Sequence, residues 1–567
     1  MNVAPTLLTH PEFADIDRHF ARFINDFGEG ELPAIAAVML SRNIRHGHIC
    51  LDLVRGPVHF DEPLPVFIWP KLETWEKAFT KNRAIGGPAD GRPLVLDNAG
   101  RLYLRRYWEY EKALAEAILL RCDSQTPANP RMGDLQELAI ETALARRFVV
   151  ISGGPGTGKT TTVLKILERM LSQPGGENLR IALAAPTGKA AARLQETLLA
   201  GGANGVRQDR LPKSASTLHR LLGSRRNSVY FRHNAKNPLP VDLVVVDEAS
   251  MVPLTMMAKL FAALPHRANV ILLGDRDQLS SVEPGAVLGD IARAASEPGP
   301  LQGSLVVLDK NYRFGNESNI FALCNAVREG EIERALKILN SGERPDVISG
   351  RTPPPVQVTE RLRQRVIAGY SAYLRAPDPA EALKEFKKFR VLCSLRTGPY
   401  GVESLNRAIE KILREERLVT GTQTTYAGMP ILITQNDYQL RLYNGDIGIL
   451  LPDPTNGSLL AWFIGEDGGI RRVPPARLPE YEPAFVMTVH KSQGSEFDNV
   501  LLILPDKESP VLTRELIYTG LTRARSRVEV WFQESVLRAA IARTIQRGSG
   551  LRDRLCEAGR RRNSDLA

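Results

Sequence analysis

The sequence predicts an α/β protein with two tandem parallel-sheet domains, a small β domain inserted into the second, and a mainly helical N-terminal domain. Short, nearly continuous apolar runs precede helical patterns in two parts of the chain, as expected for strands buried on both faces of a parallel sheet. In the second part, a stretch of alternating apolar and polar residues interrupts these runs, which indicates half-buried strands. The 567 residues also exceed what a single hydrophobic core organises.

The first region, residues 1–125, is predicted to be mainly helical. Apolar residues recur at helical spacing in LPAIAAVMLSRNI and in YLRRYWEYEKALAEAILLRC. No catalytic pattern occurs in this region. The turn-rich stretch CDSQTPANPRMGD follows it and is predicted to be a linker.

The second region, residues 126–345, is predicted to be the first sheet domain. Its strand-like runs are RRFVVISG, RIALAAP, VDLVVVDEA and ANVILLGD. A loop and a helical pattern follow each run, which is typical of a parallel sheet covered by helices.

The third region, residues 346–567, is predicted to be the second sheet domain. Its strand-like runs are FRVLCSL, AFVMTVH, NVLLILP and RVEVWFQ. Between the first two of these, residues from about 425 to 480 alternate in polarity and contain the turn signal Asn444–Gly445. We expect them to form a small inserted β-barrel or β-meander.

Composition narrows the class of protein only modestly. The 74 basic and 64 acidic residues give a net charge of +10, which fits a polyanion such as nucleic acid but is common in other proteins. The five cysteines are scattered without a C-x-x-C pair, so we expect reduced thiols and no zinc site. No signal peptide or membrane-spanning run is recognisable, and we expect a cytoplasmic protein without a membrane partner.

A phosphate loop lies at residues 153–160, where GGPGTGKT matches the pattern G-x-x-x-x-G-K-[ST] between a predicted strand and a predicted helix. Its glycines allow backbone N–H groups to surround phosphate oxygens, and the helix N-terminus adds partial positive charge. We expect Lys159 to reach the β- and γ-phosphates of ATP and Thr160 to hold Mg²⁺. The predicted nucleotide-binding residues of this loop are Gly153, Gly154, Pro155, Gly156, Thr157, Gly158, Lys159, Thr160 and Thr161.

Two acidic residues follow the strand in VVVDEAS. Asp247 is predicted to hold the metal together with Thr160, and Glu248 to act as general base on the attacking water. In ILLGDRDQLSSVEPGA, Gln278 is predicted to hydrogen-bond the γ-phosphate or the water, and Asp275 is assigned only a role in loop structure.

Positive charge on the far side of the triphosphate would complete the site. The candidates are Arg313 in NYRF and Arg523 in YTGLTRARSR, with Arg525 as a lesser choice. Because Arg523 belongs to the second sheet domain, its use would place ATP in a cleft between domains that hydrolysis opens and closes. The predicted catalytic set is Lys159, Thr160, Asp247, Glu248, Gln278, Arg313 and Arg523.

The motifs occur in an order that resembles the superfamily 1 helicases and, more closely, the RecD family. The matching stretches are VISGGPGTGKTTTV, APTGKAAARL, STLHRLLG, VVDEASM, LLGDRDQLSSVEPGAVLGD, YNGDIGI, MTVHKSQGSEFD and YTGLTRAR. They extend from about residue 130 to the end of the chain.

This resemblance implies an ATP-dependent motor that moves 5′ to 3′ on single-stranded DNA, with two RecA-like domains and an SH3-like subdomain at about 425–480. It also implies a heterotrimer with RecB and RecC that unwinds and degrades double-stranded DNA ends in recombinational repair. The nuclease would lie in another subunit, and the N-terminal region would dock on RecC. Gln136 would recognise adenine, and SRRNSVYFRHNAKNPLP would be a small wedge-like insertion.

The resemblance also implies a set of DNA-contacting residues, namely Pro186, Thr187, Thr217, His219, Thr488, His490 and Lys491. Hydroxyls, a histidine and a lysine at strand ends suit phosphate contacts, which position DNA without reading its sequence. A core-lining role for His490 stays open. Tyr438 and Tyr443 are candidates for stacking on bases, with core or surface roles equally open.

Two alternatives remain open from the sequence. One is a stand-alone RecD-like 5′-to-3′ helicase, and the other is an ATP-dependent nucleic-acid clamp that does not translocate. A small-molecule kinase is least favoured, because two sheet domains and a β insertion exceed its needs. The direction of travel and the preference for DNA over RNA rest on the resemblance alone.

Overall fold

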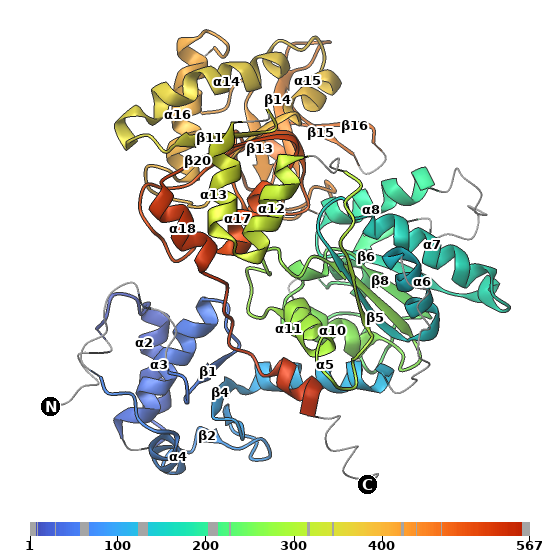
Figure 1. Cartoon of the computed structure of the whole chain (residues 1–567), viewed down its shortest axis with the longest axis vertical. Coiled ribbons are helices and arrows are strands. Elements are labelled where there is room, and N and C mark those ends of the chain that lie inside the picture. The colour runs from blue at the N-terminus through green and yellow to red at the C-terminus, as the bar shows by residue number, and fades with distance from the viewer. Residues whose placement is uncertain are drawn as a thin grey trace.

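The computed structural model describes residues 7–557 apart from 8, 29, 57–59, 61–66, 123–133, 202–211, 213, 226–227, 314–317, 343–344, 421–423, 438 and 466–467. Two helix-covered sheet lobes and a smaller N-terminal part are visible in Figure 1. The predicted fold class is confirmed.

The N-terminal part is mainly helical, as predicted, and also contains a four-stranded sheet of order β1–β4–β3–β2 that the sequence did not predict. Its elements are α2 (Asp15–Asn25), α3 (Glu31–Arg45), β1 (Cys50–Asp52), α4 (Leu72–Thr80), β2 (Ile85–Gly86), β3 (Leu94–Leu96), β4 (Arg101–Leu104) and α5 (Arg105–Cys122). Helix α5 packs between this small sheet and the first large one, since Leu114 and Ile118 share a core with Val95 and Tyr103 as well as with Val244 and Leu272.

The first large sheet has the order β10–β5–β9–β8–β6–β7, and all of its pairs are parallel. Its strands are β5 (Phe148–Gly153), β6 (Ile181–Ala185), β7 (Ala215–Thr217), β8 (Leu243–Val246), β9 (Asn269–Gly274) and β10 (Leu305–Leu308). Successive β5 residues alternate between two cores: Phe148 and Val150 face one, and Val149 and Ile151 face the other.

Helices cover both faces of this sheet, which explains the continuous apolar runs in the sequence. The helices are α6 (Leu135–Ala145), α7 (Lys159–Ser172), α8 (Gly188–Gly201), α9 (Leu218–Leu222), α10 (Leu254–Ala263) and α11 (Val287–Ala295).

The second large sheet has the order β11–β20–β19–β12–β18 and is also entirely parallel. Its strands are β11 (Val347–Arg351), β12 (Phe389–Cys393), β18 (Val486–Thr488), β19 (Phe497–Ile503) and β20 (Ala524–Phe532). Its covering helices are α12 (Asn319–Glu329), α13 (Ile332–Ser341), α14 (Val358–Leu374), α15 (Pro379–Phe386), α16 (Val402–Glu415), α17 (Arg514–Leu521) and α18 (Glu534–Ala542). Helices α12 and α13 contribute Leu323 and Leu336 to the core of this second sheet.

Within the second lobe, the alternating region forms an antiparallel sheet of order β16–β15–β14–β13–β17. The strands are β13 (Pro430–Ile433), β14 (Ile447–Pro452), β15 (Leu459–Ile464), β16 (Ile470–Val473) and β17 (Tyr481–Pro483). The predicted domain boundaries, and the SH3-like character of this insertion, stay predictions.

The C-terminal segment returns from the second lobe to the N-terminal part, as the red trace in Figure 1 shows. Ile49 N–H donates to the Gly548 carbonyl at 2.8 Å, and Arg554 pairs with Glu111 at 2.8 Å. Leu551 and Leu555 lie in the core that contains α5. Across the described ranges, no helix combines the length and the apolar character needed to cross a bilayer.

Candidate active site

The phosphate loop joins the end of β5 to the start of α7, as the sequence predicted. Gly156 and Gly158 have φ angles of 84° and 80°, which glycine adopts without steric cost. The Thr157 hydroxyl donates to the Gly154 carbonyl at 2.8 Å and closes the turn. The first turn of α7 therefore presents its free N–H groups toward the loop, which is the geometry of an anion site.

Lys159 is the first residue of α7, and its side chain folds back over the loop. Its ammonium group donates to the Gly153 carbonyl at 2.5 Å and to the Gly154 carbonyl at 3.1 Å. Thr160 and Thr161 follow in the same turn, with Thr160 half-buried and Thr161 exposed. The lysine thus occupies the concave side of the loop, where a phosphate would take over its hydrogen bonds.

Asp247 and Glu248 follow β8, which lies two strands from β5 in the sheet. The Glu248 N–H donates to the Asp247 carboxylate at 2.8 Å, and Glu248 itself has a φ of 50°. Burial and the charge of Glu248 together raise the pKa of Asp247 to about 6, against the opposing charge of Lys159. A buried carboxyl whose ionised form is disfavoured in this way fits a bound cation, and carboxylate and hydroxyl oxygens such as those of Asp247 and Thr160 are ligands of the kind that Mg²⁺ prefers.

Asp275, directly after β9, connects the two lobes. Its carboxylate accepts hydrogen bonds from the Gln278 amide at 3.0 Å and from the Tyr518 hydroxyl of α17 at 3.0 Å. Asp275 is 2% exposed, and burial raises its pKa while the charge of Lys159 lowers it. The sequence predicts for Asp275 only a role in loop structure, and it does not predict that Tyr518 belongs to the site. The one available signal was the position of Tyr518 in the same motif as Arg523.

Arg523 lies between α17 and β20 and is 2% exposed. Its guanidinium donates to the Thr519 carbonyl at 3.0 Å and to the Ser495 carbonyl at 3.2 Å. Burial lowers its pKa, whereas the charges of Glu248 and Asp275 in the first lobe raise it. Because Asp275 interacts electrostatically with both Lys159 and Arg523, these two cations flank the same seam.

Arg313 follows β10 and lies against the phosphate loop. A Cβ atom on Gly156 would come within 2.5 Å of the Arg313 Cβ, so the loop depends on a glycine here. The Arg313 guanidinium pairs with Glu496 of the second lobe at 2.5 Å. Both predicted arginines therefore lie at the contact between lobes.

Gln136 and Tyr312 lie on another side of the loop. A Cβ atom on Gly158 would be 2.7 Å from the Gln136 amide nitrogen and 3.6 Å from the Tyr312 ring. The Gln136 side-chain oxygen accepts from Lys165 at 3.2 Å, and Tyr312 N–H donates to the Gly156 carbonyl at 2.8 Å. Tyr312 is 56% exposed, and the sequence reasoning missed it although NYRF was quoted for its arginine.

The predicted DNA-contacting residues form two groups. In the first lobe, Pro186 and Thr187 follow β6, and Thr217 ends the adjacent β7 and caps α9 by accepting from the Arg220 N–H at 3.2 Å. Because Ala185 and Thr217 are in register, these residues reach one edge of the sheet together. His219 lies one residue into α9 and packs edge-on against Phe231 at 5.8 Å.

In the second lobe, Thr488 ends β18, and His490 and Lys491 lie in the short 3-10 helix η6 (His490–Ser492) that follows. Lys491 pairs with Glu482 at 2.7 Å, and burial lowers the pKa of His490. Tyr443 lies against Gly188 at the start of α8, which brings the β insertion next to the first lobe. Tyr438 and residues 226–227 of the expected wedge lie outside the described residues.

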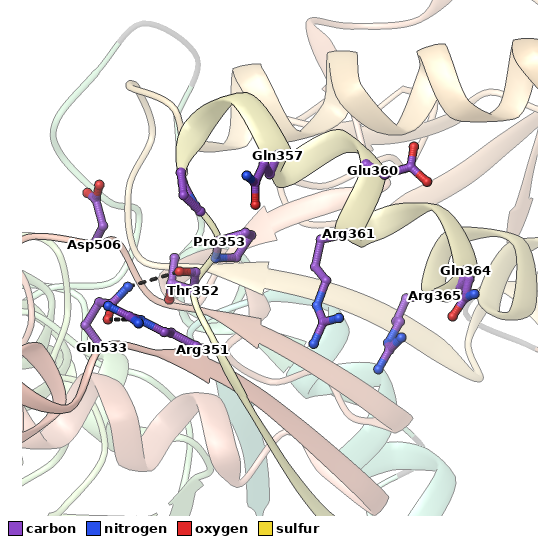
Figure 2. Close-up of a pocket in the computed structure, with 11 residues that line it drawn as sticks. Arg351, Thr352, Pro353, Gln357, Glu360, Arg361, Gln364, Arg365, Asp506 and Gln533 are labelled. Carbon is purple, nitrogen blue, oxygen red and sulfur yellow. Dashed lines mark hydrogen bonds between the residues drawn. The ribbon is translucent and has the colours of Figure 1, made fainter.

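A cavity of about 810 Å³ lies elsewhere, at the carboxyl ends of β11 and β20. Figure 2 shows Arg361 and Arg365 extending from α14 toward the strands, while Arg351 donates to Gln533 at 3.0 Å. None of the predicted site residues lines this cavity.

Together, a phosphate loop on one parallel sheet and the buried Arg523 of the lobe built on a second sheet define a P-loop nucleoside-triphosphatase with a two-lobed core. The family model of the AAA domain matches residues 136–284, and that of the UvrD-like helicase C-terminal domain matches residues 483–530. The model of the N-terminal domain of RecBCD enzyme subunit RecD matches residues 10–103.

Three curated relatives define the family. The chain is 40% identical to RecBCD enzyme subunit RecD of Mycolicibacterium smegmatis, over 93% of this chain and 94% of that protein. It is 35% identical to the same subunit of Haemophilus influenzae, over 86% and 84% of the two chains. It is 33% identical to the ATP-dependent RecD2 DNA helicase of Deinococcus radiodurans, over 76% of this chain but 54% of that protein. The chain belongs to the RecD family.

Proposed function

We propose that this chain is an ATP-dependent DNA helicase that acts as the 5′-to-3′ motor subunit of a RecBCD-type complex. Such a complex unwinds and degrades double-stranded DNA ends during recombinational repair of double-strand breaks. The observation that carries the motor function is the seam in which Asp275 faces Lys159 of one lobe and Tyr518 and Arg523 of the other. A ligand bound at this seam would contact groups of both lobes.

In the proposed cycle, the loop N–H groups and Lys159 bind the β- and γ-phosphates of ATP. Asp247 and Thr160 would hold Mg²⁺, which supplies neutralisation of the developing phosphate charge. Glu248 orients and deprotonates the attacking water, and Gln278 reports the γ-phosphate to Asp275.

Arg313 and Arg523 stabilise the charge that develops on the γ-phosphoryl group. Gln136 reads the adenine edge, and the exposed Tyr312 ring, close to the same loop, stacks on the base. Closure of the seam on ATP and its opening after hydrolysis would move the two lobes relative to each other.

DNA would lie along the edge that carries Pro186, Thr187, Thr217 and His219 in the first lobe. In the second lobe it would meet Thr488, His490 and Lys491. These residues offer hydroxyl, imidazole and ammonium groups, which bind the phosphate backbone without regard to sequence. The strand would be the 5′-ended single strand at a duplex end.

The subunit hypothesis is favoured over a stand-alone helicase. Alignment with the RecD subunits spans most of both proteins, whereas the chain matches only 54% of the RecD2 helicase. The match of residues 10–103 to the RecD N-terminal domain supports RecB and RecC as partners, with RecC docking on the N-terminal part. We place the complex in the cytoplasm, and the nuclease in another subunit.

Strand separation on tailed duplexes tests the motor function. We expect ATP-dependent unwinding of a duplex with a 5′ tail, little on a 3′ tail, and loss of both unwinding and DNA-stimulated ATP hydrolysis in Lys159→Gln. Hydrolysis without strand separation or displacement of a bound protein would instead support the clamp alternative.

Co-purification from the native cell tests the assembly. We expect two large partners to elute with the chain in a stable complex. Recovery of the chain alone would favour the stand-alone helicase.

A further inference from the structure

Glu496 is a buried carboxylate at the seam to which the proposed cycle assigns no role. It lies directly before β19 in the second lobe, and its side chain is 5% exposed. Arginines from both lobes surround it. Arg313 and Arg193 of the first lobe contact Oε1 at 2.5 and 2.6 Å, and Arg525 of the second lobe contacts Oε2 at 3.0 Å.

The charges around Glu496 keep it ionised. Burial would raise the pKa of its carboxyl, but the charges of Arg193 and Arg313 outweigh burial and bring the pKa down to about 2. One carboxylate thus binds cations from three separate elements: α8, the segment after β10, and β20. A single negative charge shared among three guanidinium groups, of which only that of Arg313 is largely buried, leaves an excess of positive charge.

The arginines held by Glu496 also face the catalytic acids. The charge of Glu496 raises the pKa of Arg193 against the effect of burial, and Glu248 and Asp247 contribute to the same shift. Arg313 lies within contact distance of the phosphate loop at Gly156. A γ-phosphate bound to the loop would therefore meet arginines already paired with a carboxylate.

We propose that Glu496 is a positioning residue that occupies the place of the γ-phosphate among these arginines and competes with it for Arg313 and Arg193. This inference rests on the proposed function and deepens it. A diphosphate has no group that enters the competition, so the carboxylate weakens binding of the triphosphate without affecting that of the diphosphate. Charge-assisted bonds of arginine to carboxylate and to phosphate have the same forked geometry, so one can replace the other.

The position of Glu496 in the chain links its competition with the γ-phosphate to the binding of single-stranded DNA. The loop from Thr488 to Glu496 carries His490 and Lys491 at one end and the arginine-binding carboxylate at the other. Within the loop, Gln493 donates to the Leu279 carbonyl at 2.7 Å, and Ser495, next to Glu496, accepts a hydrogen bond from Lys189 of α8 at 2.6 Å. We expect DNA bound at the start of the loop to draw the carboxylate away from the arginines through these contacts and so to favour triphosphate binding.

Nucleotide binding to the full chain tests this proposal. Calorimetric titration with a non-hydrolysable ATP analogue and with ADP, without DNA, is compared in wild type and Glu496→Gln. Because allosteric couplings usually span about 5- to 150-fold, we expect the substitution to tighten analogue binding by at least about fivefold and to leave ADP binding within about twofold. Adding oligothymidylate should tighten analogue binding in wild type and have little further effect in the variant.

Three further variants distinguish a positioning role of Glu496 from a general effect of substitution on folding. Glu496→Asp retains the charge and should keep the wild-type ratio of analogue affinity to ADP affinity. Arg525→Gln removes an arginine that is 52% exposed, so it should fold normally. Because Glu496 then loses one of its partners and holds the two arginines of the first lobe more strongly, analogue binding should weaken slightly, in the direction opposite to Glu496→Gln. Glu529→Gln removes another carboxylate of the second sheet, paired with Arg365 at 3.2 Å, and should change neither nucleotide affinity.

Equal changes in analogue and ADP affinity, or weaker analogue binding in Glu496→Gln, would overturn the proposal. These titrations contain no duplex and require no hydrolysis. Failure of strand separation would therefore refute the motor function without touching this result, and the reverse also holds.

Discussion

The two large sheets share an architecture, but they present opposite ends of their strands to the seam between the lobes. In the first sheet, Gly153 ends β5, and Asp247 and Asp275 directly follow β8 and β9, at the carboxyl ends where open parallel sheets usually bind ligands. In the second sheet, Glu496 and Arg523 precede the amino ends of β19 and β20. The carboxyl ends of β11 and β20 instead border the cavity of Figure 2, away from the seam.

Because of this difference, the two lobes contribute different groups to the site. The first lobe offers backbone N–H groups and a helix N-terminus, which bind a phosphate through fixed local geometry. The second lobe offers side-chain charges whose distance from that phosphate depends on how the lobes meet. Binding should therefore depend mainly on the first lobe, and the rate of the reaction on the second.

The largest expected effect comes from removing a charge of the second lobe. Arg523→Ala should lower kcat for ATP hydrolysis by about 1,000-fold, because an arginine that stabilises the transition state is worth about 10³ or more. Nucleotide affinity should stay within about tenfold, since one good interaction at most is lost from the ground state. Steady-state kinetics with equilibrium binding separates the two quantities.

Two controls accompany Arg523→Ala. Arg523→Lys keeps a charge without the guanidinium fork, and Arg527→Ala removes an exposed arginine of β20, the strand that begins directly after Arg523. An equal loss of binding and rate in Arg523→Ala would contradict the division between lobes.

The next effect tests the first lobe. In Gly156→Ala the new Cβ would lie 2.5 Å from the Arg313 Cβ at a φ of 84°, so the loop must shift. Such strain costs about 1–3 kcal/mol, which corresponds to roughly 5- to 150-fold weaker ATP binding. Gly175→Ala is the matched control, because Gly175 has the same φ of 84° with nothing within 4 Å of its Cβ position. Similar affinity losses in both variants would show that the loop contact is unimportant.

A smaller effect concerns the contact between lobes. Tyr518→Phe removes the hydroxyl that donates to Asp275 at 3.0 Å, and Tyr373→Phe removes one that donates to the Gly428 carbonyl at 2.8 Å within the second lobe. Each should cost about 1 kcal/mol of unfolding free energy, measured by denaturant titration. Only Tyr518→Phe should also lower DNA-stimulated ATP hydrolysis, by about fivefold. A change of rate in Tyr373→Phe would argue against a specific role of the seam.

The smallest effect is a pH dependence at Lys189. Burial lowers the pKa of this lysine to about 7, and the charges of Arg390 and Lys387 contribute. Between pH 7 and 9 the unfolded chain therefore holds a proton that the folded chain has released, so this group makes stability rise with pH. Thermal unfolding at both pH values should show a shallower rise in Lys189→Met than in wild type. Identical slopes would contradict the burial of this ammonium group.

Much of the first lobe was predictable because its chemistry is local. GGPGTGKT lies within eight consecutive residues, and VVVDEAS places two acids directly after a buried strand. The turn and the helix start that present these groups follow from neighbouring residues alone. The order of the motifs also indicated the family that the comparisons confirm.

Other features could not be read from local patterns. The packing of α5 on the first sheet, and the return of Leu551 to the same core, depend on contacts between distant segments. The small N-terminal sheet escaped prediction because its strands have only two to four residues, too few for a periodic signal.

The sequence by itself determined that this chain binds a nucleoside triphosphate through a phosphate loop and that it has two sheet lobes. Only the tertiary structure decided which side chains meet across the seam. Tyr518 reaches Asp275 over 243 positions of sequence, and Glu496 reaches Arg313 over 183. A buried charge is stable only where groups that compensate it surround it. No single stretch of the chain contains both Glu496 and Arg313, or both Asp275 and Tyr518. Their contacts therefore depend on how the two sheets face each other.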